Sequence, residues 1–183
     1  MISRTVLFLD IDGVLCTLRS HFAMQNPGGL NDAWDMTSCM MIRRLCEKYK
    51  MAIVISSTWR VNRAEVLQQY MSIHQLDSFL YGEINRSGNY YGVYPKDKTE
   101  WTTPNHIGRF RGKELEMWLC AHPEVERYVI VDDDSDFLEW QRPFHVKTDP
   151  YEGFGAKNYM EIDKYLSGQT ECIVRHNLPE TEA

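Results

Sequence analysis

The chain has 183 residues, 43% of them hydrophobic and 25% charged, a composition typical of a globular protein with one well-packed core. Its formal net charge of -6 argues against a broad basic surface for duplex DNA or an anionic membrane, but leaves room for a small anionic ligand. The five cysteines include no Cys-x-x-Cys pair, and no leader or membrane-spanning run stands out, so we expect a reduced, cytoplasmic protein.

The first predicted element is a buried strand over Thr5–Leu9, because this apolar run is short and uninterrupted. Two acids separated by one residue, Asp10 and Asp12, follow it directly, and Gly13 comes next. An ordinary turn could account for Asp12 and Gly13. Removing a carboxylate from water is costly, however, so a pair at the end of a buried strand indicates a metal, a charged partner or catalysis.

An irregular polar segment is expected at 17–32, which contains the loop signal Asn-Pro-Gly-Gly. Apolar residues that recur every three or four positions then predict a helix over Met36–Tyr49. The next buried strand is predicted at Met51–Ile55, and it also ends in polar side chains, Ser56 and Ser57.

A further helix is predicted to begin near Asn62, and a third strand to cover Ser78–Ile84. Periodicity is lost across 85–110, where glycines and prolines interrupt a series of aromatic residues, so we expect a functional loop or a small insertion. Its aromatic side chains could stack on unpaired bases, although a local packing cluster is the more ordinary explanation. The next helix is predicted over Lys113–Ala121.

The fourth predicted strand, Tyr128–Val131, again ends in acids, namely Asp132, Asp133 and Asp136. Beyond these acids, the last predicted elements are a strand near 144–147, a helix near 156–166 and a polar tail at 169–183. We therefore expect a single domain over 1–168.

Strands that alternate with helices predict a doubly wound, Rossmann-like α/β fold, with a parallel sheet covered on both faces. Ligands bind beyond the carboxyl ends of such strands, so the polar side chains after the first, second and fourth strands should converge there. These side chains are Asp10, Asp12, Ser56, Ser57, Asp132, Asp133 and Asp136.

This convergence favours a particular chemistry. Several ionised carboxylates share a small space only when a cation is present, and oxygen ligands without a histidine or cysteine cluster favour Mg²⁺. A magnesium ion with an open position takes a phosphate oxygen, while serine hydroxyls and a lysine hold the other oxygens. One carboxylate is then available to attack phosphorus, and a second can protonate the leaving oxygen and later deprotonate water.

The chain resembles the haloacid dehalogenase (HAD) superfamily of phosphohydrolases. The first motif of that superfamily, Asp-x-Asp-Gly, corresponds to 10–13, and the second, a serine or threonine closing strand two, corresponds to Ser56 with Ser57 as the alternative. The acids after the fourth strand match the last motif. All four motifs occur in order over roughly residues 5 to 166.

The third motif is a lysine or arginine ahead of strand four. It is best matched by Lys113, with Arg109 and Arg111 as rivals. The resemblance implies that this cation neutralises the nucleophile and the phosphoryl group.

The resemblance also implies a role for each acid. Asp10 would be the nucleophile, forming an aspartyl-phosphate, and a ligand of Mg²⁺. Asp12 would be the general acid and base, with its backbone carbonyl at the metal. Asp132 would bind the metal directly, with Asp133 or Asp136 acting close by or through water.

A narrower resemblance is carried by 57–60, by the Arg-Gly-Lys-Glu helix start and by the acidic run after the fourth strand. These segments look like the HAD domains of Swiss Army knife RNA-repair proteins. That likeness implies nucleotides or nucleic-acid ends as substrates, with Ser57, Arg60 and Arg111 as substrate-binding residues. Arg60 would suit a second phosphate or the plane of a base.

In this superfamily, insertions after strand one and before motif three act as caps that select the substrate. Both corresponding segments, 17–32 and 85–110, are short, so we expect a small or absent cap and an open site. The expected partner is a phosphorylated substrate and not a membrane. The alternatives are a nucleotidase or small-metabolite phosphatase, and a HAD-like scaffold or binding domain without catalysis.

Overall fold

The computed structural model describes residues 4–25, 34–82, 98–105 and 110–173. The strands are β1 (Thr5–Leu9), β2 (Ala52–Ile55), β3 (Arg127–Asp132) and β4 (His145–Lys147). The α-helices are α1 (Leu18–Gln25), α2 (Met36–Tyr49), α3 (Trp59–Asn62), α4 (Ala64–Ile73), α5 (Lys98–Trp101), α6 (Arg111–Ala121) and α7 (Ala156–Leu166). Short 3-10 helices occur at η1 (Asp77–Phe79) and η2 (Arg142–Phe144).

The strands of the described residues form one parallel sheet in the order β2-β1-β3-β4. Leu9, the last residue of β1, pairs with Ile55 of β2 and with Val131 of β3, so these three strands end side by side. The order reverses between β1 and β3, because β2 lies on one side of β1 and the later strands lie on the other. Ligands bind at this kind of switch point in open α/β sheets.

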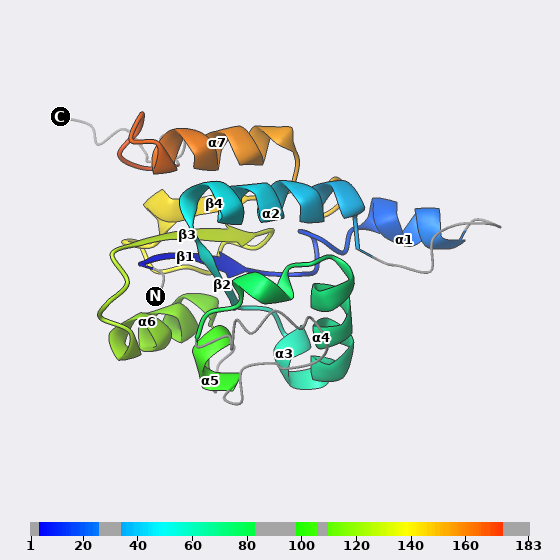
Figure 1. The fold of residues 1–183 in the computed structure, drawn as a ribbon, viewed down its shortest axis with the longest axis horizontal. Helices are drawn as coiled ribbons and strands as arrows, with labels where there is room; N and C mark the ends of the chain where they lie inside the picture. The colour runs from blue at the N-terminus through cyan, green and yellow to red at the C-terminus, as the bar shows by residue number, and fades with distance from the viewer. Residues whose placement is uncertain (1–3, 26–33, 83–97, 106–109, 174–183) are drawn as a thin grey trace.

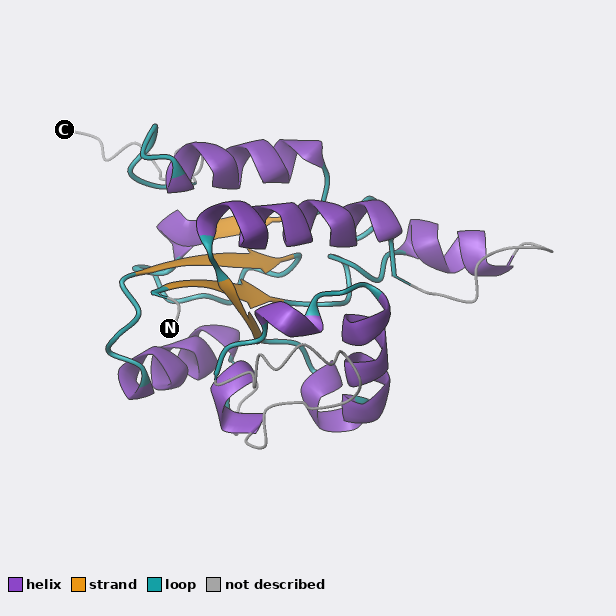
Figure 2. Ribbon diagram, viewed as in Figure 1, coloured by secondary structure: helices purple, strands orange, loops and turns teal. Residues whose placement is uncertain are grey.

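Helices cover both faces of the sheet, as Figure 1 and Figure 2 show. The helices α2 and α7 lie on one face, while α3, α4, α5 and α6 lie on the other. Because β1 is covered from both sides, the side chains of Val6 to Leu9 are all 0% exposed. This burial explains why the strand reads as a continuous apolar run without alternation. The predicted doubly wound α/β fold is confirmed.

The predicted bounds of β1, α2 and α7 are confirmed to the residue. At the start of α2, the carboxylate of Asp35 accepts a hydrogen bond from the backbone N–H of Ser38 at 2.9 Å. At its end, Lys50 has the left-handed φ of 55°, and its N–H donates to the carbonyl of Cys46. Local capping therefore reinforces the apolar periodicity that predicted this helix.

The expectation of an irregular segment at 17–32 is wrong for its first part, which forms α1. Thr17 and Ser20 start this helix through a reciprocal pair of bonds: the Ser20 N–H donates to the Thr17 hydroxyl at 3.1 Å, and the Thr17 N–H donates to the Ser20 hydroxyl at 2.9 Å. The helix has little apolar periodicity, so the spacing of its apolar residues did not predict it. Residues 26–33 of this predicted segment lie outside the described residues.

The predicted third strand at Ser78–Ile84 is also wrong within the described part, 78–82. Its first residues belong to η1, and Leu80 forms only an isolated bridge to Ile53. A second isolated bridge joins Thr102 to Ile55 on the same strand, β2. Two short segments from distant parts of the chain therefore pair with β2, where a continuous strand was expected.

Little of the expected loop at 85–110 can be compared with the structure, since 83–97 and 106–109 lie outside the described residues. The same is true of 174–183 in the expected polar tail. The described end of that tail is attached to the domain: the N–H of Ile173 donates to the carbonyl of Pro143 at 2.7 Å, and its side chain packs on the core. None of the helices in the described ranges combines the length and apolar character needed to cross a bilayer.

Candidate active site

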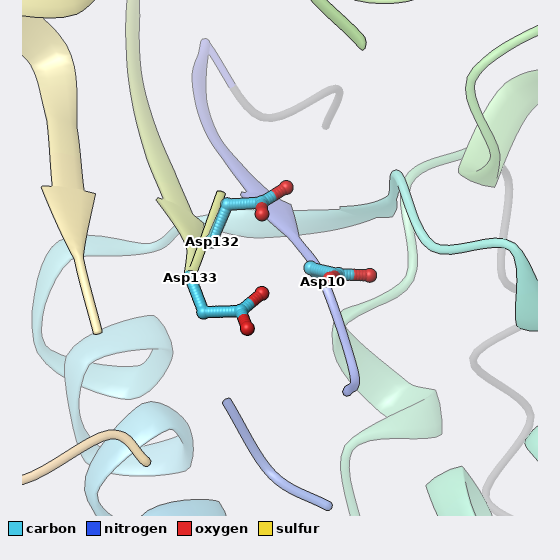
Figure 3. A group of neighbouring side chains, drawn as sticks. All are labelled: Asp10, Asp132 and Asp133. Atoms are coloured by element: carbon cyan, nitrogen blue, oxygen red, sulfur yellow. The ribbon is translucent and has the colours of Figure 1, made fainter. Parts of the chain in front are cut away.

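Three carboxylates meet at the carboxyl edge of the sheet, between β1 and β3. Asp10 follows β1 directly, Asp132 is the last residue of β3, and Asp133 comes next. Figure 3 shows the three side chains at these adjoining strand ends. One oxygen of each carboxylate lies within 4.8 Å of the others. The sheet enforces this proximity, because the N–H of Asp10 extends the ladder by donating to the carbonyl of Val131 at 3.0 Å.

Burial changes the acidity of this group. Asp10 is 6% exposed and Asp132 is 1% exposed. Burial raises the pKa of both carboxyls, because removal from water penalises their charged forms. The charge of Asp10 raises the pKa of Asp132 further, whereas the Arg111 guanidinium lowers both values. Burial also raises the pKa of Asp133. The charge of Arg111 is therefore insufficient to stabilise the ionised forms of all three acids together.

A hard divalent cation fits this arrangement. Among the described residues, the buried Oδ2 atom of Asp132 has no hydrogen-bond partner and only an ion-pair contact of 3.5 Å with Arg111, so a metal ion bound at this oxygen would stabilise it. All members of the group are carboxylates, the ligands that Mg²⁺ prefers in proteins. The side chains placed to hold such an ion are Asp10, Asp132 and Asp133.

The cation beside these acids is Arg111, the first residue of α6. Its guanidinium nitrogens lie 3.9 Å from Oδ1 of Asp10 and 3.5 Å from Oδ2 of Asp132. Only 15% of the Arg111 side chain is exposed. One further nitrogen lies 3.5 Å from the carboxylate of Glu114, so the guanidinium is held from both sides.

Lys113, the residue predicted for this position, lies elsewhere. Its ammonium group pairs with Glu116 at 2.8 Å on the exposed surface of α6, and 46% of its side chain is exposed. The structure therefore places Arg111, and not Lys113, beside the acids. Arg109, the other rival, lies outside the described residues.

Arg60 does not present a free guanidinium to a substrate. It is 8% exposed and pairs with the buried Glu114 at 2.7 Å. Its Nε and Nη1 atoms donate to the backbone carbonyls of Thr103 and Ser57, and Nη2, the atom that pairs with Glu114, also donates to the carbonyl of Pro104. The predicted role in binding a phosphate or a base is therefore corrected: Arg60 ties the end of β2 to α6 and to the segment after α5.

Of the two serines at the end of β2, Ser57 faces the nucleophile position. Its hydroxyl hydrogen-bonds to Asp10, and this bond lowers the pKa of that carboxyl. The Ser56 hydroxyl is buried and makes no hydrogen bond in the described part of the chain. The two predicted alternatives for the second motif are thus placed differently, with Ser57 beside Asp10.

The Asp12 side chain is exposed and is not one of the three carboxylates grouped within 4.8 Å, but its charge contributes to raising the pKa of Asp10 and that of Asp133. Its Oδ2 atom accepts a hydrogen bond of 2.9 Å from the indole N–H of Trp59. The turn that contains Asp12 and Gly13 is tight, since the carbonyl of Ile11 accepts from the N–H groups of Leu15 and Cys16 at 2.9 and 2.8 Å.

Asp136 also lies outside the carboxylate group. Its Oδ2 atom accepts a hydrogen bond of 2.9 Å from the backbone N–H of Arg111, and its carbonyl accepts from the N–H of Gly112 at 3.0 Å. A carboxylate here satisfies N–H groups at the start of α6 and suits the positive end of the helix dipole. Asp136 therefore orients the helix that carries Arg111, whereas a place among the metal ligands was predicted for it.

Two residues of the site were not singled out by the sequence. Glu114 joins Arg60 to Arg111, and Trp59 holds Asp12. In a single sequence, a glutamate buried within a helix cannot be told from a glutamate on the surface of one. No sequence pattern therefore indicated the role of Glu114. Trp59 directly follows the second motif, but nothing in the surrounding sequence indicates its hydrogen bond to Asp12.

The sequence matches, over residues 6–159, the family described as "HAD domain in Swiss Army Knife RNA repair proteins". A search of curated proteins and a search of solved structures found no match. The matched range contains all but the first residue of β1, all of β3 and every acid of the site, and the family suggests a hydrolase of the phosphatase type. The chain therefore belongs to the family of HAD domains found in Swiss Army Knife RNA repair proteins.

Proposed function

We propose that this protein is a Mg²⁺-dependent phosphomonoester hydrolase that acts through an aspartyl-phosphate on Asp10. The observation that carries the proposal is the meeting of Asp10, Asp132 and Asp133, with Arg111 beside them and with a buried Asp132 oxygen that lacks a hydrogen bond among the described residues. A set of acids balanced by one guanidinium suits a dianionic phosphoryl group and a divalent cation better than a neutral ligand.

Asp10 is placed for nucleophilic attack. One of its carboxylate oxygens forms a bond to phosphorus while the bond from phosphorus to the leaving oxygen breaks. The Ser57 hydroxyl and Arg111 hold the carboxylate of Asp10 in its ionised form and in a fixed direction. Arg111 is also close enough to contact phosphoryl oxygens as negative charge develops on them. A bound Mg²⁺ would neutralise charge on the carboxylates and phosphoryl oxygens and orient the phosphoryl group.

Asp12 is placed to move protons. In the first half of the reaction the protonated carboxyl of Asp12 donates its proton to the leaving alkoxide. In the second half the Asp12 carboxylate takes a proton from water as the water oxygen attacks phosphorus, and Asp10 leaves as a carboxylate. Ester and water are converted to alcohol and phosphate, and both aspartates return to their starting states.

We infer a phosphate at a nucleic-acid end as the substrate. The family description names RNA repair proteins, which supports this class. The exposed side chain of Asp12 supports it as well, because the leaving group of a polynucleotide is large and must meet its proton donor at the surface.

The test is phosphate release with Mg²⁺ from a panel of esters: oligoribonucleotides with a 3′ or a 5′ phosphate, nucleoside monophosphates, a free sugar phosphate and p-nitrophenyl phosphate. The proposal expects the oligonucleotides to be hydrolysed with the highest kcat/KM. Chelation of the metal and Asp10→Asn should each abolish turnover. Asp134→Asn, which removes an exposed neighbouring acid, serves as the matched control and should retain activity.

Other results would point elsewhere. If the free sugar phosphate or a mononucleotide is turned over as well as the oligonucleotides, the protein is a small-metabolite phosphatase or a nucleotidase. If no ester releases phosphate and Asp10→Asn changes nothing, the enzyme proposal fails and a scaffold or binding role takes its place.

A further inference from the structure

We infer that Trp59 is a positioning residue that holds Asp12 in the orientation needed for proton transfer. This inference rests on the proposed phosphatase function and goes beyond it, because it assigns a role to a residue outside the acids and cations. It begins from one contact: the indole N–H of Trp59 donates to Oδ2 of Asp12 at 2.9 Å.

This contact is unusual for its two partners. Asp12 is exposed, and an exposed aspartate ordinarily satisfies its oxygens with water and samples several rotamers. Trp59, in contrast, is 4% exposed, so its N–H is supplied from a buried ring. Because the ring cannot follow a moving carboxylate, the bond restricts the carboxylate to the direction of the indole.

The ring itself is held on several sides. The rings of Trp34 and Tyr70 lie 6.0 and 6.2 Å from it, centroid to centroid, and the Arg63 guanidinium lies over it at 4.9 Å. The backbone is anchored as well, since the N–H of Trp59 donates to the Ser57 hydroxyl at 3.4 Å. The segment from Ser57 to Trp59 therefore links the Ser57 hydroxyl, which lies beside Asp10, to the indole N–H, which bonds to Asp12.

The chemistry of an indole makes it suited to this task. An indole N–H is a donor only, so it can bond to Oδ2 when Asp12 is ionised and also when Asp12 is protonated. In the protonated form Oδ2 must then be the carbonyl oxygen, which leaves the proton on Oδ1. Trp59 therefore selects the oxygen that gives and takes the proton, without competing for that proton.

The two possible roles of the Trp59 ring, filling the core and positioning Asp12, lead to different expected effects when the ring is replaced. Loss of packing would affect every substrate alike. Loss of positioning affects only substrates whose leaving group must be protonated. A nitrophenolate leaves without a proton, whereas the alkoxide of a sugar or nucleotide does not. The parameter to compare is kcat/KM, because it covers the steps up to departure of the leaving group and excludes the later attack by water.

The experiment compares wild type, Trp59→Phe and Trp34→Phe, with Mg²⁺, on p-nitrophenyl phosphate and on the alkyl ester of the panel that wild type hydrolyses fastest. Trp59→Phe keeps an aromatic ring and removes the donor. Trp34→Phe is the matched control, because it makes the same change in a neighbouring ring that contacts Trp59. If phenylalanine at position 59 impairs folding, a further variant carries 3-benzothienylalanine there. In that side chain sulfur replaces the N–H, so the donor is removed and the size of the ring is preserved.

We expect the donorless variants at position 59 to lose about 10-fold or more in kcat/KM for the alkyl ester, within the range of general acid catalysis, and less than about 2-fold for p-nitrophenyl phosphate. Trp34→Phe should not lower the kcat/KM for the alkyl ester more than the kcat/KM for p-nitrophenyl phosphate. Equal losses on both substrates, or no loss on either, would overturn the inference. Absence of activity in wild type on every ester would instead refute the proposed function, and the inference with it.

Discussion

A Cβ atom added to Gly13 would lie 2.3 Å from the Cγ atom of Asp133, so the Asp133 carboxylate occupies the space that any other side chain at this position would need. Gly13 also has a φ of 69°, in the left-handed region that glycine adopts most readily. The glycine that follows the two aspartates thus has two roles. It makes the turn after β1, and it lets an acid from β3 approach that turn.

Gly13→Ala should weaken Mg²⁺ binding by about 10-fold or more, because the methyl group displaces Asp133, and losses of this size follow when a metal site is disturbed. The alanine should also destabilise the fold by about 1–2 kcal/mol through its left-handed backbone. Titration of Mg²⁺ by calorimetry measures the first effect and urea unfolding the second.

Gly168→Ala separates the two effects. Gly168 has a φ of 79°, and a Cβ there would meet nothing within 4 Å. This control should show the backbone destabilisation with unchanged Mg²⁺ affinity. An equal loss of Mg²⁺ affinity in both variants would show that the contact with Asp133 is unimportant.

Asp132→Asn should leave the metal-free protein as stable as wild type or more stable. The substitution removes a buried charge that is repelled by Asp10 and lacks a hydrogen bond on Oδ2. The same variant should lose the stabilisation by Mg²⁺ that raises the Tm of wild type, a free energy of about 2.7 kcal/mol at a metal concentration of 100 Kd. Thermal unfolding with and without Mg²⁺ measures both effects. A lower Tm without the metal, combined with a normal response to Mg²⁺, would contradict the assignment of Asp132 as a ligand.

Arg111→Met should reduce kcat by about 100-fold or more, the usual effect of removing a donor that stabilises charge in the transition state. Lys113→Met should change kcat by less than about 2-fold, because an exposed ion pair such as that of Lys113 with Glu116 contributes little. Steady-state kinetics on the best ester of the panel distinguishes the two residues. The opposite ranking would restore Lys113 as the third-motif cation.

The buried pair of Arg60 and Glu114 should dominate the stability of the region around β2 and α6. Removing one partner leaves the other charge buried, so Arg60→Met should cost about 3–5 kcal/mol of unfolding free energy. Replacing both residues with methionine should cost less than the sum of the two single changes. Urea unfolding of the two single variants and the double variant tests this. Additive losses would mean that the two side chains act independently.

The stability of wild type should depend on pH through Asp35, the N-cap of α2. Burial alone would raise the pKa of this carboxyl, but the N–H of Ser38 and the Arg19 guanidinium hold it below its usual range. Since the pKa is lower in the folded state, the carboxylate stabilises the fold above the unfolded value of about 3.9, and this stabilisation is lost as the pH falls through the folded value.

Asp35→Asn retains an oxygen that can cap the helix and removes the titrating charge. At neutral pH the unfolding free energy of wild type should exceed that of this variant by about 0.5–1 kcal/mol. The difference is small because solvent partly screens the pair with the half-exposed Arg19. Unfolding at several pH values should show the two proteins converging in acid. A constant difference across the whole range would exclude a contribution from the charge of Asp35.

Local patterns predicted most of the sheet and the acids at its edge. The apolar run of β1 and the helical periodicity of α2 are properties of neighbouring residues, so their bounds could be read directly. The α1 helix was missed because caps, and not apolar spacing, define it. The strand expected at Ser78–Ile84 failed because pairing with β2 depends on where the rest of the chain runs.

The sequence by itself determined which strands end in acids, and hence that these acids share one edge of the sheet. Of the acids predicted to converge, Asp10, Asp132 and Asp133 form the close group, whereas Asp12 and Asp136 do not. Only the tertiary structure decided which of two near neighbours serves the site. Arg111 and Lys113 are separated by a rotation of about 200° around a helix with 3.6 residues per turn, so they point to nearly opposite sides and the packing of α6 selects Arg111. Arg60 and Glu114 are 54 residues apart, and no local pattern reveals that they pair. Burial is encoded in short stretches of sequence, whereas the partner of a buried charge is set by the packing of distant elements.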